Sequence, residues 1–73
     1  MEPQFTIIYE RDEKAGWIAT IPEVPGAFSE GRTKRLAREN VIDALKELMA
    51  ARRDLAVRRR SPASVVEELS LTG

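Results

Sequence analysis

One stretch, residues 16–33, limits most strongly what this chain can fold into. Pro22 has no backbone N–H to donate to a sheet, so strand pairing must end there or lie at an edge. Pro25 and Gly26 form a turn signal, because proline fixes φ and glycine is free to adopt a positive φ. The stretch therefore predicts a strand, a turn, a second short strand and the start of a helix.

Two strands are expected before this turn and one after it. Residues 4–10 and 17–21 are rich in β-branched and aromatic side chains, and a short third strand is expected at residues 27–30. Residues 11–16 are charged and end in glycine, as the loop of a hairpin does. In the first strand the odd-numbered side chains are the more apolar, so we expect them to face the core.

A long helix is expected from residue 34 to about residue 53, with Thr33 as its N-cap. Apolar side chains recur there at spacings of three and four and so form one buried stripe. The stripe comprises Leu36, Ala37, Val41, Ala44, Leu45 and Leu48. Residues 61–73 are ambiguous, because a fourth strand, a short helix capped by Ser64 and a mobile tail all fit the pattern.

These elements predict an α+β fold of two layers, in which one long helix packs on one face of an antiparallel sheet of three or four strands (β-β-β-α-β). The 73 residues form a single domain, near the lower limit for a self-sufficient core. The helix covers only one sheet face, so we name Ile8, Ile18 and Thr20 on the other face as a candidate interface. We predict self-association, with a dimer favoured, and expect Ile18→Lys to weaken it without unfolding the domain.

The residue types present exclude several kinds of catalytic site. The chain has no His and no Cys, which rules out a His base, a Ser-His-Asp triad, a Cys nucleophile and a thiolate metal site. Its four glycines are too scattered to cradle a phosphate. Acids near the hairpin and the turn are the remaining metal ligands to consider, namely Glu10, Asp12, Glu13, Glu23 and Glu30. Because loop acids are mostly solvated, we expect no enzyme activity, no catalytic residue and no metal or cofactor.

Charge is unevenly distributed, although the formal net charge is zero. Residues 1–30 carry −4 (two bases, six acids), residues 31–60 carry +6 (ten bases, four acids) and residues 61–73 carry −2 (two acids). The basic part ends in a candidate patch made of Arg52, Arg53, Arg58, Arg59 and Arg60. The patch could contact phosphates or an acidic protein. A solubilising helix end explains it as well, and no aromatic residues are interleaved for base stacking.

Nothing in the sequence directs the chain to a membrane. No apolar run approaches the roughly 20 residues that span a bilayer. The start of the chain also lacks the basic and apolar regions of a signal peptide. We therefore expect a cytoplasmic protein with no membrane partner.

Several short motifs lie close together in the first two thirds of the chain. They are YERDE at residues 9–13, GWIATIPEVPGAFSEG at residues 16–31, and then Thr33, Ala37, Asn40 and Ala44. Over roughly residues 5–50 the chain resembles the N-terminal domain of HicB-type antitoxins. One departure is Ala27, where members of that family often have cysteine.

The resemblance implies a partial ribonuclease-H-like fold without the catalytic acids of that fold. It also implies a protein that binds and neutralises a small HicA-like toxin, which is an mRNA-cleaving protein with a double-stranded-RNA-binding-domain-like fold. Many such antitoxins carry a further C-terminal domain that binds operator DNA. Only 13 residues follow Arg60 in this sequence, so direct DNA binding is not expected.

Three functions therefore stay open at the level of the sequence. The first is a non-catalytic, antitoxin-like protein-binding module. The second is a solitary HicB-like regulatory or RNA-binding domain with a different partner, which would use the arginine patch. The third is a nuclease or other metal-dependent enzyme that uses the hairpin acids. For this function, divalent ions would raise the melting temperature and Asp12→Asn would remove the effect.

Overall fold

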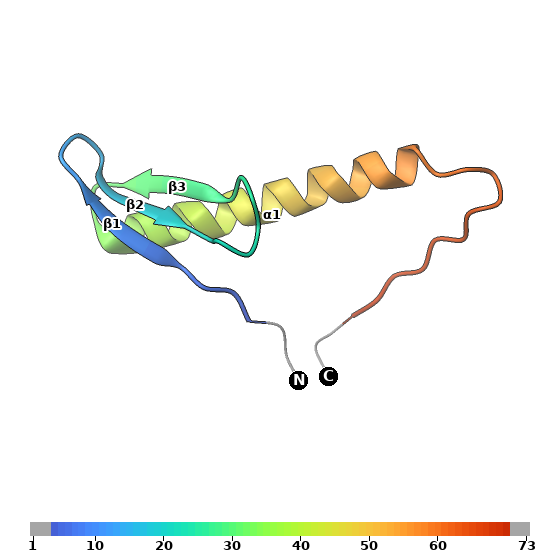
Figure 1. Cartoon of the computed structure of the whole chain (residues 1–73), viewed down its shortest axis with the longest axis horizontal. Coiled ribbons are helices and arrows are strands. Elements are labelled where there is room, and N and C mark those ends of the chain that lie inside the picture. The colour runs from blue at the N-terminus through green and yellow to red at the C-terminus, as the bar shows by residue number, and fades with distance from the viewer. Residues whose placement is uncertain (1–3, 71–73) are drawn as a thin grey trace.

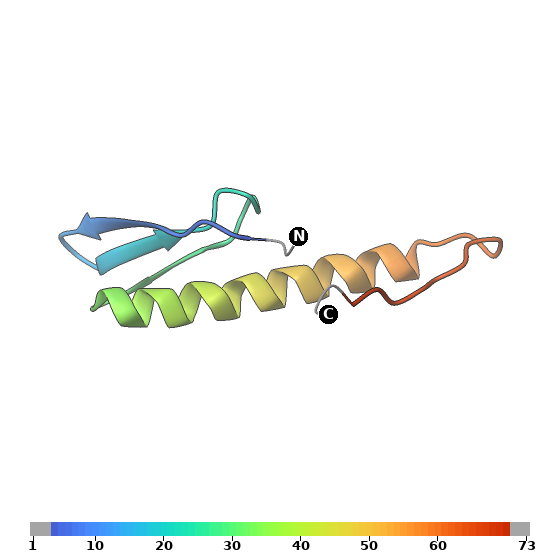
Figure 2. The ribbon, with the colours of Figure 1, turned by 90° about the horizontal axis from the view of Figure 1, so that it is seen from below.

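The computed structural model describes residues 4–70. Its elements, in chain order, are β1 (Ile8–Asp12), β2 (Gly16–Thr20), β3 (Phe28–Gly31) and α1 (Lys34–Arg58). The strands form one antiparallel sheet in the order β1-β2-β3. The sheet lies on one side of the first half of α1, and the rest of the helix extends past it (Figures 1 and 2). The two-layer α+β fold predicted from the sequence is confirmed.

The strand register decides which side chains face the helix. Tyr9 lies opposite Ala19 across the β1–β2 pair, and Ala19 lies opposite Ser29 across the β2–β3 pair. Ala19 is fully buried and Tyr9 packs against the core, whereas Ile8 on the other face is 46% exposed. The odd-numbered side chains of β1 and β2 therefore face α1, as the alternation predicted.

The core between sheet and helix is small. Its buried hydrophobic residues are Ala19, Ile21, Ala27, Ala37 and Val41. Because three of them are alanines, the helix can approach the sheet closely, and Ile21 and Val41 supply the bulk. The stripe predicted for α1 is confirmed at its centre, where Leu45 and Leu48 also pack against the core, but Leu36 at its start is 38% exposed.

Residues 21–27 form a compact turn that closes on itself. The N–H of Ile21 donates to the carbonyl of Ala27 at 2.9 Å, and the N–H of Ala27 donates to the carbonyl of Val24 at 3.0 Å. Gly26 has φ of 91°, the positive value that its place in a Pro-Gly turn predicted. Strand pairing ends at Thr20, just before Pro22, so the proline limits the sheet as expected.

The same turn explains why β1 is shorter at its start than predicted. Ile8 pairs with Thr20, the last residue of β2. Residues 4–7 would need residues 21–24 as ladder partners, but those residues are folded into the turn. The first strand therefore begins at Ile8 and not at residue 4.

Two residues fix the start of α1 against the sheet. A Cβ added at Gly31 would lie only 2.5 Å from the backbone nitrogen of Ala37, so only glycine permits this approach. Thr33 is the N-cap, as predicted: its backbone is extended and its Oγ1 accepts from the N–H of Leu36 at 3.1 Å.

Replacing Thr33 with Ala should therefore lower the free energy of unfolding by about 1 kcal/mol, because the helix loses one of its few N-terminal partners. Thermal or urea denaturation of the purified variant measures the loss. Thr33→Ser keeps the hydroxyl and should remain close to the parent chain. Equal losses for Ala and Ser would show that the hydroxyl does not cap the helix.

The C-terminal part of the chain differs from the prediction. α1 continues to Arg58, past the expected end near residue 53, because no helix-breaking residue occurs before Pro62. Residues 61–70 form neither helix nor strand. Of the three forms left open for this segment, the described residues have the form of a tail, and residues 71–73 lie outside the described part.

Candidate functional site

The sheet face turned away from α1, called here the outer sheet face, is built by cross-strand register. One row across the strands is Ile8, Thr20 and Phe28, and the next row is Glu10, Ile18 and Glu30. Side chains directly opposite each other point to the same face. The structure therefore brings Ile8, Ile18 and Thr20 together, as their even numbering predicted.

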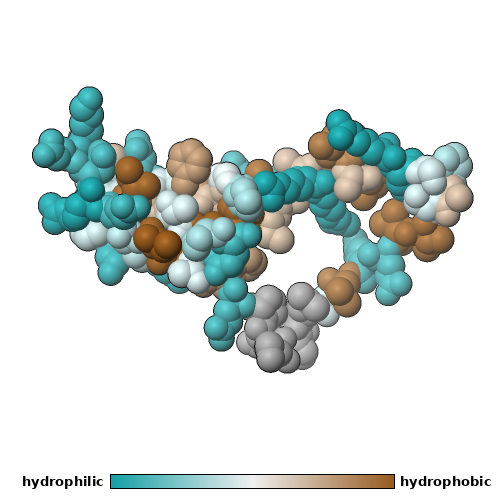
Figure 3. Space-filling view, viewed as in Figure 1, coloured by the Kyte–Doolittle hydropathy of each residue, from teal (hydrophilic) through white to brown (hydrophobic). Residues whose placement is uncertain are grey.

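Large apolar side chains on this face are open to solvent. Phe28 is 63% exposed and Ile8 is 46% exposed. Figure 3 views the molecule from the side of the sheet and shows apolar side chains set among hydrophilic ones over the strands. On a chain of this size, such a group of exposed apolar side chains is typical of a contact surface.

Phe28 was missing from the sequence-based set of interface residues. The sequence placed it in the third strand but did not say which residue lies opposite. That register depends on the length of the turn at residues 21–27, which places Phe28 opposite Thr20. The number of residues in the turn is the signal that could have identified Phe28. Adding or removing one residue there would move the Phe28 side chain to the sheet face that packs on α1.

The outer sheet face also carries negative charge. Glu10 and Glu30 lie on either side of Ile18, and none of the six side chains in the two rows is basic. An apolar row beside an acidic row is complementary to a partner surface that is apolar and basic.

The other acids named from the sequence do not join them. Asp12 Oδ2 accepts from the N–H of Ala15 at 2.7 Å and from the N–H of Lys14 at 3.0 Å, which shapes the hairpin turn. Glu23 is bound to Thr6 near the start of β1. Over residues 4–70 no three acids come close enough to hold a metal ion.

Glu23 is held by two hydrogen bonds from one residue. Its carboxylate accepts from Thr6 Oγ1 at 2.6 Å and from the Thr6 N–H at 2.9 Å. The Thr6 hydroxyl, and next the Thr6 N–H, hold the pKa of Glu23 below its ordinary value of 4.5 because both bonds favour the ionised form. The contact fastens the segment before β1 to the turn after β2.

A pH dependence follows from this lowered pKa. The stabilisation from Glu23 should be complete above pH 4.5 and should disappear as the pH falls through the lower folded-state pKa. Glu23→Gln should remove that part of the acid sensitivity, which is small because the carboxylate is exposed. Melting temperatures measured between neutral pH and strongly acidic pH test this, and an unchanged pH profile in the variant would rule out the Thr6 contact.

The predicted arginine patch is divided among different contacts. Arg52 Nη2 donates to the carbonyl of Pro25 at 2.8 Å, and Arg53 forms an exposed ion pair with Glu68 at 2.9 Å. Arg60 Nη1 donates to the carbonyl of Val57 at 2.6 Å. Within residues 4–70, Arg58 and Arg59 form no ion pair. Two arginines of the patch, Arg52 and Arg53, therefore contact the turn and the tail. The guanidinium groups of Arg58 and Arg59 are left for other partners.

Trp17 lies on the helix side of the sheet, on the same face as Ala19. It is half-buried against the core, and the guanidinium of Arg11 lies 5.2 Å from its ring centroid. Lys34 at the start of α1 lies over Tyr9 in the same way, at 4.9 Å. Both rings are therefore occupied by protein groups and offer no open stacking platform.

These observations define a small two-layer α+β domain with one uncovered sheet face that is apolar and acidic. The chain belongs to the UPF0150 family. It is 32% identical over 71 residues to a UPF0150 protein of Synechocystis, and the match covers 97% of both chains. It is also 33% identical over 43 residues to a UPF0150 protein of Thermoplasma acidophilum, in a match that covers 59% of this chain and 62% of that protein.

Other comparisons add no activity to this family membership. No protein-family model matches the chain, and no solved structure matches it either. The names of the two relatives state no substrate or partner. Within residues 4–70, no helix is both long and apolar enough to cross a membrane.

Proposed function

We propose that this chain is a non-catalytic protein-binding domain of the HicB antitoxin type, which binds and neutralises a small HicA-like mRNA-cleaving toxin. The observation that carries the proposal is the outer sheet face, where exposed Ile8 and Phe28 lie beside Glu10 and Glu30. The resemblance of residues 16–31 to HicB-type antitoxins and membership of the UPF0150 family support the same assignment.

The mechanism is one of surface complementarity. A protein that cleaves mRNA must hold phosphates, so its RNA-binding surface carries positive charge. The outer sheet face presents carboxylates to such a surface and adds apolar area that becomes buried on contact. Bound in this way, the chain excludes RNA from the toxin and needs no chemistry of its own.

The residue content supports a non-catalytic role. The chain has neither His nor Cys. Asp12 and Glu23 are used in hydrogen bonds that shape the hairpin and fasten the start of β1. Glu10 and Glu30 are on opposite edge strands with Ile18 between them, so apolar surface lies where a shared metal ion would have to sit.

A second candidate function uses the basic end of α1. Arg58 and Arg59 form no ion pair within the described residues, and Arg60 follows directly. A regulatory or RNA-binding domain with these contacts would bind RNA with a steep salt dependence. Neutralising Arg58, Arg59 and Arg60 together would flatten that dependence. The antitoxin assignment predicts no such binding by the isolated chain.

Affinity purification of the tagged chain from its native cells tests the proposal. A very short basic protein should be recovered with the chain and should cleave mRNA when it is separated from the chain. Recovery of RNA without a basic protein would favour the second candidate. Failure of a HicA-like product of a neighbouring gene to bind the chain would contradict the antitoxin assignment.

A further inference from the structure

Residues 53–70 extend beyond the folded body (Figure 1). The Cα radius of gyration is 15.6 Å, against about 11 Å for a compact chain of this length. Figure 2 shows α1 extending past the sheet, and the tail passing the end of α1 and folding back along it. The second half of α1 therefore has no strand above it.

The apolar stripe of α1 nevertheless continues into this uncovered half. Val41, Leu48 and Leu55 follow one another at spacings of seven and so lie on one helix face. Val41 is fully buried and Leu48 packs against the core, but Leu55 is 47% exposed. Met49, beside Leu48 in the chain, is 51% exposed. The helix end, residues 49–58, therefore carries large apolar side chains that the single chain leaves exposed.

The C-terminal tail, residues 61–70, leaves its own apolar side chains uncovered as well. Val65 is 93% exposed, Leu69 is 79% exposed and Val66 is 53% exposed. One ion pair, Arg53–Glu68, connects the tail to the helix end, and both of its side chains are mostly exposed, at 65% and 85%. An exposed ion pair of this kind contributes only about 0–1 kcal/mol, which is small beside the entropy cost of ordering the chain next to it.

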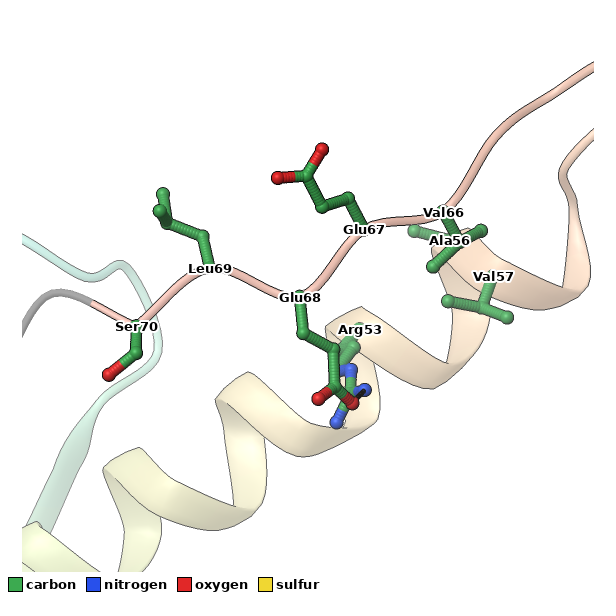
Figure 4. Close-up of a pocket in the computed structure, with 8 residues that line it drawn as sticks. All are labelled: Arg53, Ala56, Val57, Val66, Glu67, Glu68, Leu69 and Ser70. Atoms are coloured by element: carbon green, nitrogen blue, oxygen red, sulfur yellow. Dashed lines mark hydrogen bonds and ion pairs between the residues drawn. The ribbon is translucent and has the colours of Figure 1, made fainter.

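A hollow of about 760 Å³ separates the tail from the helix end. Figure 4 shows Arg53 and Glu68 pointing toward each other, while Leu69 and Glu67 point away from the helix. The hollow is lined by Arg53, Ala56, Val57, Val66, Glu67, Glu68, Leu69 and Ser70. The tail thus lies along the helix end without packing on it.

We propose that the occupant of this surface is a second copy of the chain, with the tail of each copy lying on the helix end of the other. Charge favours the exchange, because the tail carries Glu67 and Glu68 while the helix end and its cap carry the arginine patch. Two arginine-rich helix ends repel each other unless acids lie between them, and two exchanged tails supply those acids.

Chain geometry permits the exchange. The tail leaves the helix through a turn in which the N–H of Ser64 donates to the carbonyl of Ser61 at 3.0 Å. Residues 61–68 span at most about 29 Å, so the two helix ends must lie side by side around a two-fold axis. That placement covers Leu55 and Met49 of both copies and leaves both outer sheet faces free. This dimer therefore differs from the one expected from the sequence, and Ile18→Lys should not weaken it.

Cross-linking decides whether the tail contact lies within one chain or between two. The chain contains no cysteine, so Arg53→Cys and Glu68→Cys introduce single reactive thiols. Treated with a short bis-maleimide, a mixture of the two variants should give a covalent heterodimer. The variant that carries both substitutions should form cross-links between two chains in preference to a cross-link within one chain. Glu13→Cys mixed with Glu68→Cys is the matched control, because Glu13 lies in the exposed β1–β2 hairpin.

Sedimentation of the full chain provides an independent readout. We expect a concentration-dependent mass approaching twice the 8.2 kDa chain. A chain ending at Arg60 should dimerise at least about tenfold more weakly. A monomer at every concentration, a truncated chain that dimerises as well as the full one, or a double-cysteine variant that closes only on itself would each overturn the proposal.

Discussion

Replacing Ile21 with Ala should lower the free energy of unfolding by about 2–5 kcal/mol, because the change opens a cavity in the centre of the core. Ile21 is 2% exposed, and among residues 4–70 it is one of two bulky side chains that are fully buried. The total stability of a 73-residue domain is roughly 4–11 kcal/mol. The substitution should therefore remove a large part of it, which chemical denaturation followed by circular dichroism measures.

Two matched variants separate core packing from a general effect of the substitution. Ile21→Val removes one methylene and should cost about 0.5–1.5 kcal/mol. Ile8→Ala removes similar atoms from a side chain that is 46% exposed, and it should cost much less than Ile21→Ala. Equal losses at positions 8 and 21 would contradict the assignment of inner and outer sheet faces.

Replacing Phe28 with Lys should weaken binding of the basic partner by at least about 30-fold, the effect of losing a central aromatic contact. Phe28 is the most exposed large apolar side chain on the outer sheet face, at 63%. A lysine there also places positive charge against a basic surface. Titration of the purified partner by calorimetry measures the change, and Ile18→Lys should act in the same direction.

The fold itself should survive these substitutions, since both side chains point away from α1. Val65→Lys is the matched control, because it introduces the same charge at an apolar residue that is 93% exposed and lies in the tail. Its affinity for the partner should stay close to that of the parent chain. Full affinity in Phe28→Lys, with the domain still folded, would remove the outer sheet face from the proposed contact.

Local chemistry explains why much of the fold could be predicted. Pro22 cannot donate to a ladder, Gly26 permits a positive φ and Thr33 can cap a helix, and each acts through its own backbone or its nearest neighbours. The structure shows all three in these roles. The period of two in the strands likewise identified the buried face.

Features that depend on distant pairing were not predictable in the same way. The membership of Phe28 in the outer sheet face needs the register between β2 and β3. The late start of β1 needs the turn at residues 21–27 to occupy its ladder partners. The hydrogen bonds from Thr6 to Glu23 join residues 17 positions apart, and no sequence motif predicts them.

The candidate site was therefore identified only in part. Ile8, Ile18 and Thr20 were placed on one face by alternation alone. Their acidic neighbours Glu10 and Glu30 lie in segments that the sequence predicts to be strands, but the cross-strand register that sets both beside Ile18 is not visible in the sequence. The arginine patch was visible as a run of charge, but its division between turn, tail and solvent depends on tertiary contacts.

Inhibition of RNA cleavage by the co-purified basic protein tests the proposed function. The partner is assayed on mRNA with increasing amounts of the purified chain, and with the Phe28→Lys variant beside it. Cleavage should stop once the chain is present in stoichiometric amount, the variant should need a much higher concentration, and the chain alone should cleave nothing. Undiminished cleavage at a saturating concentration of the chain, or cleavage by the chain itself, would contradict an antitoxin that acts through its outer sheet face.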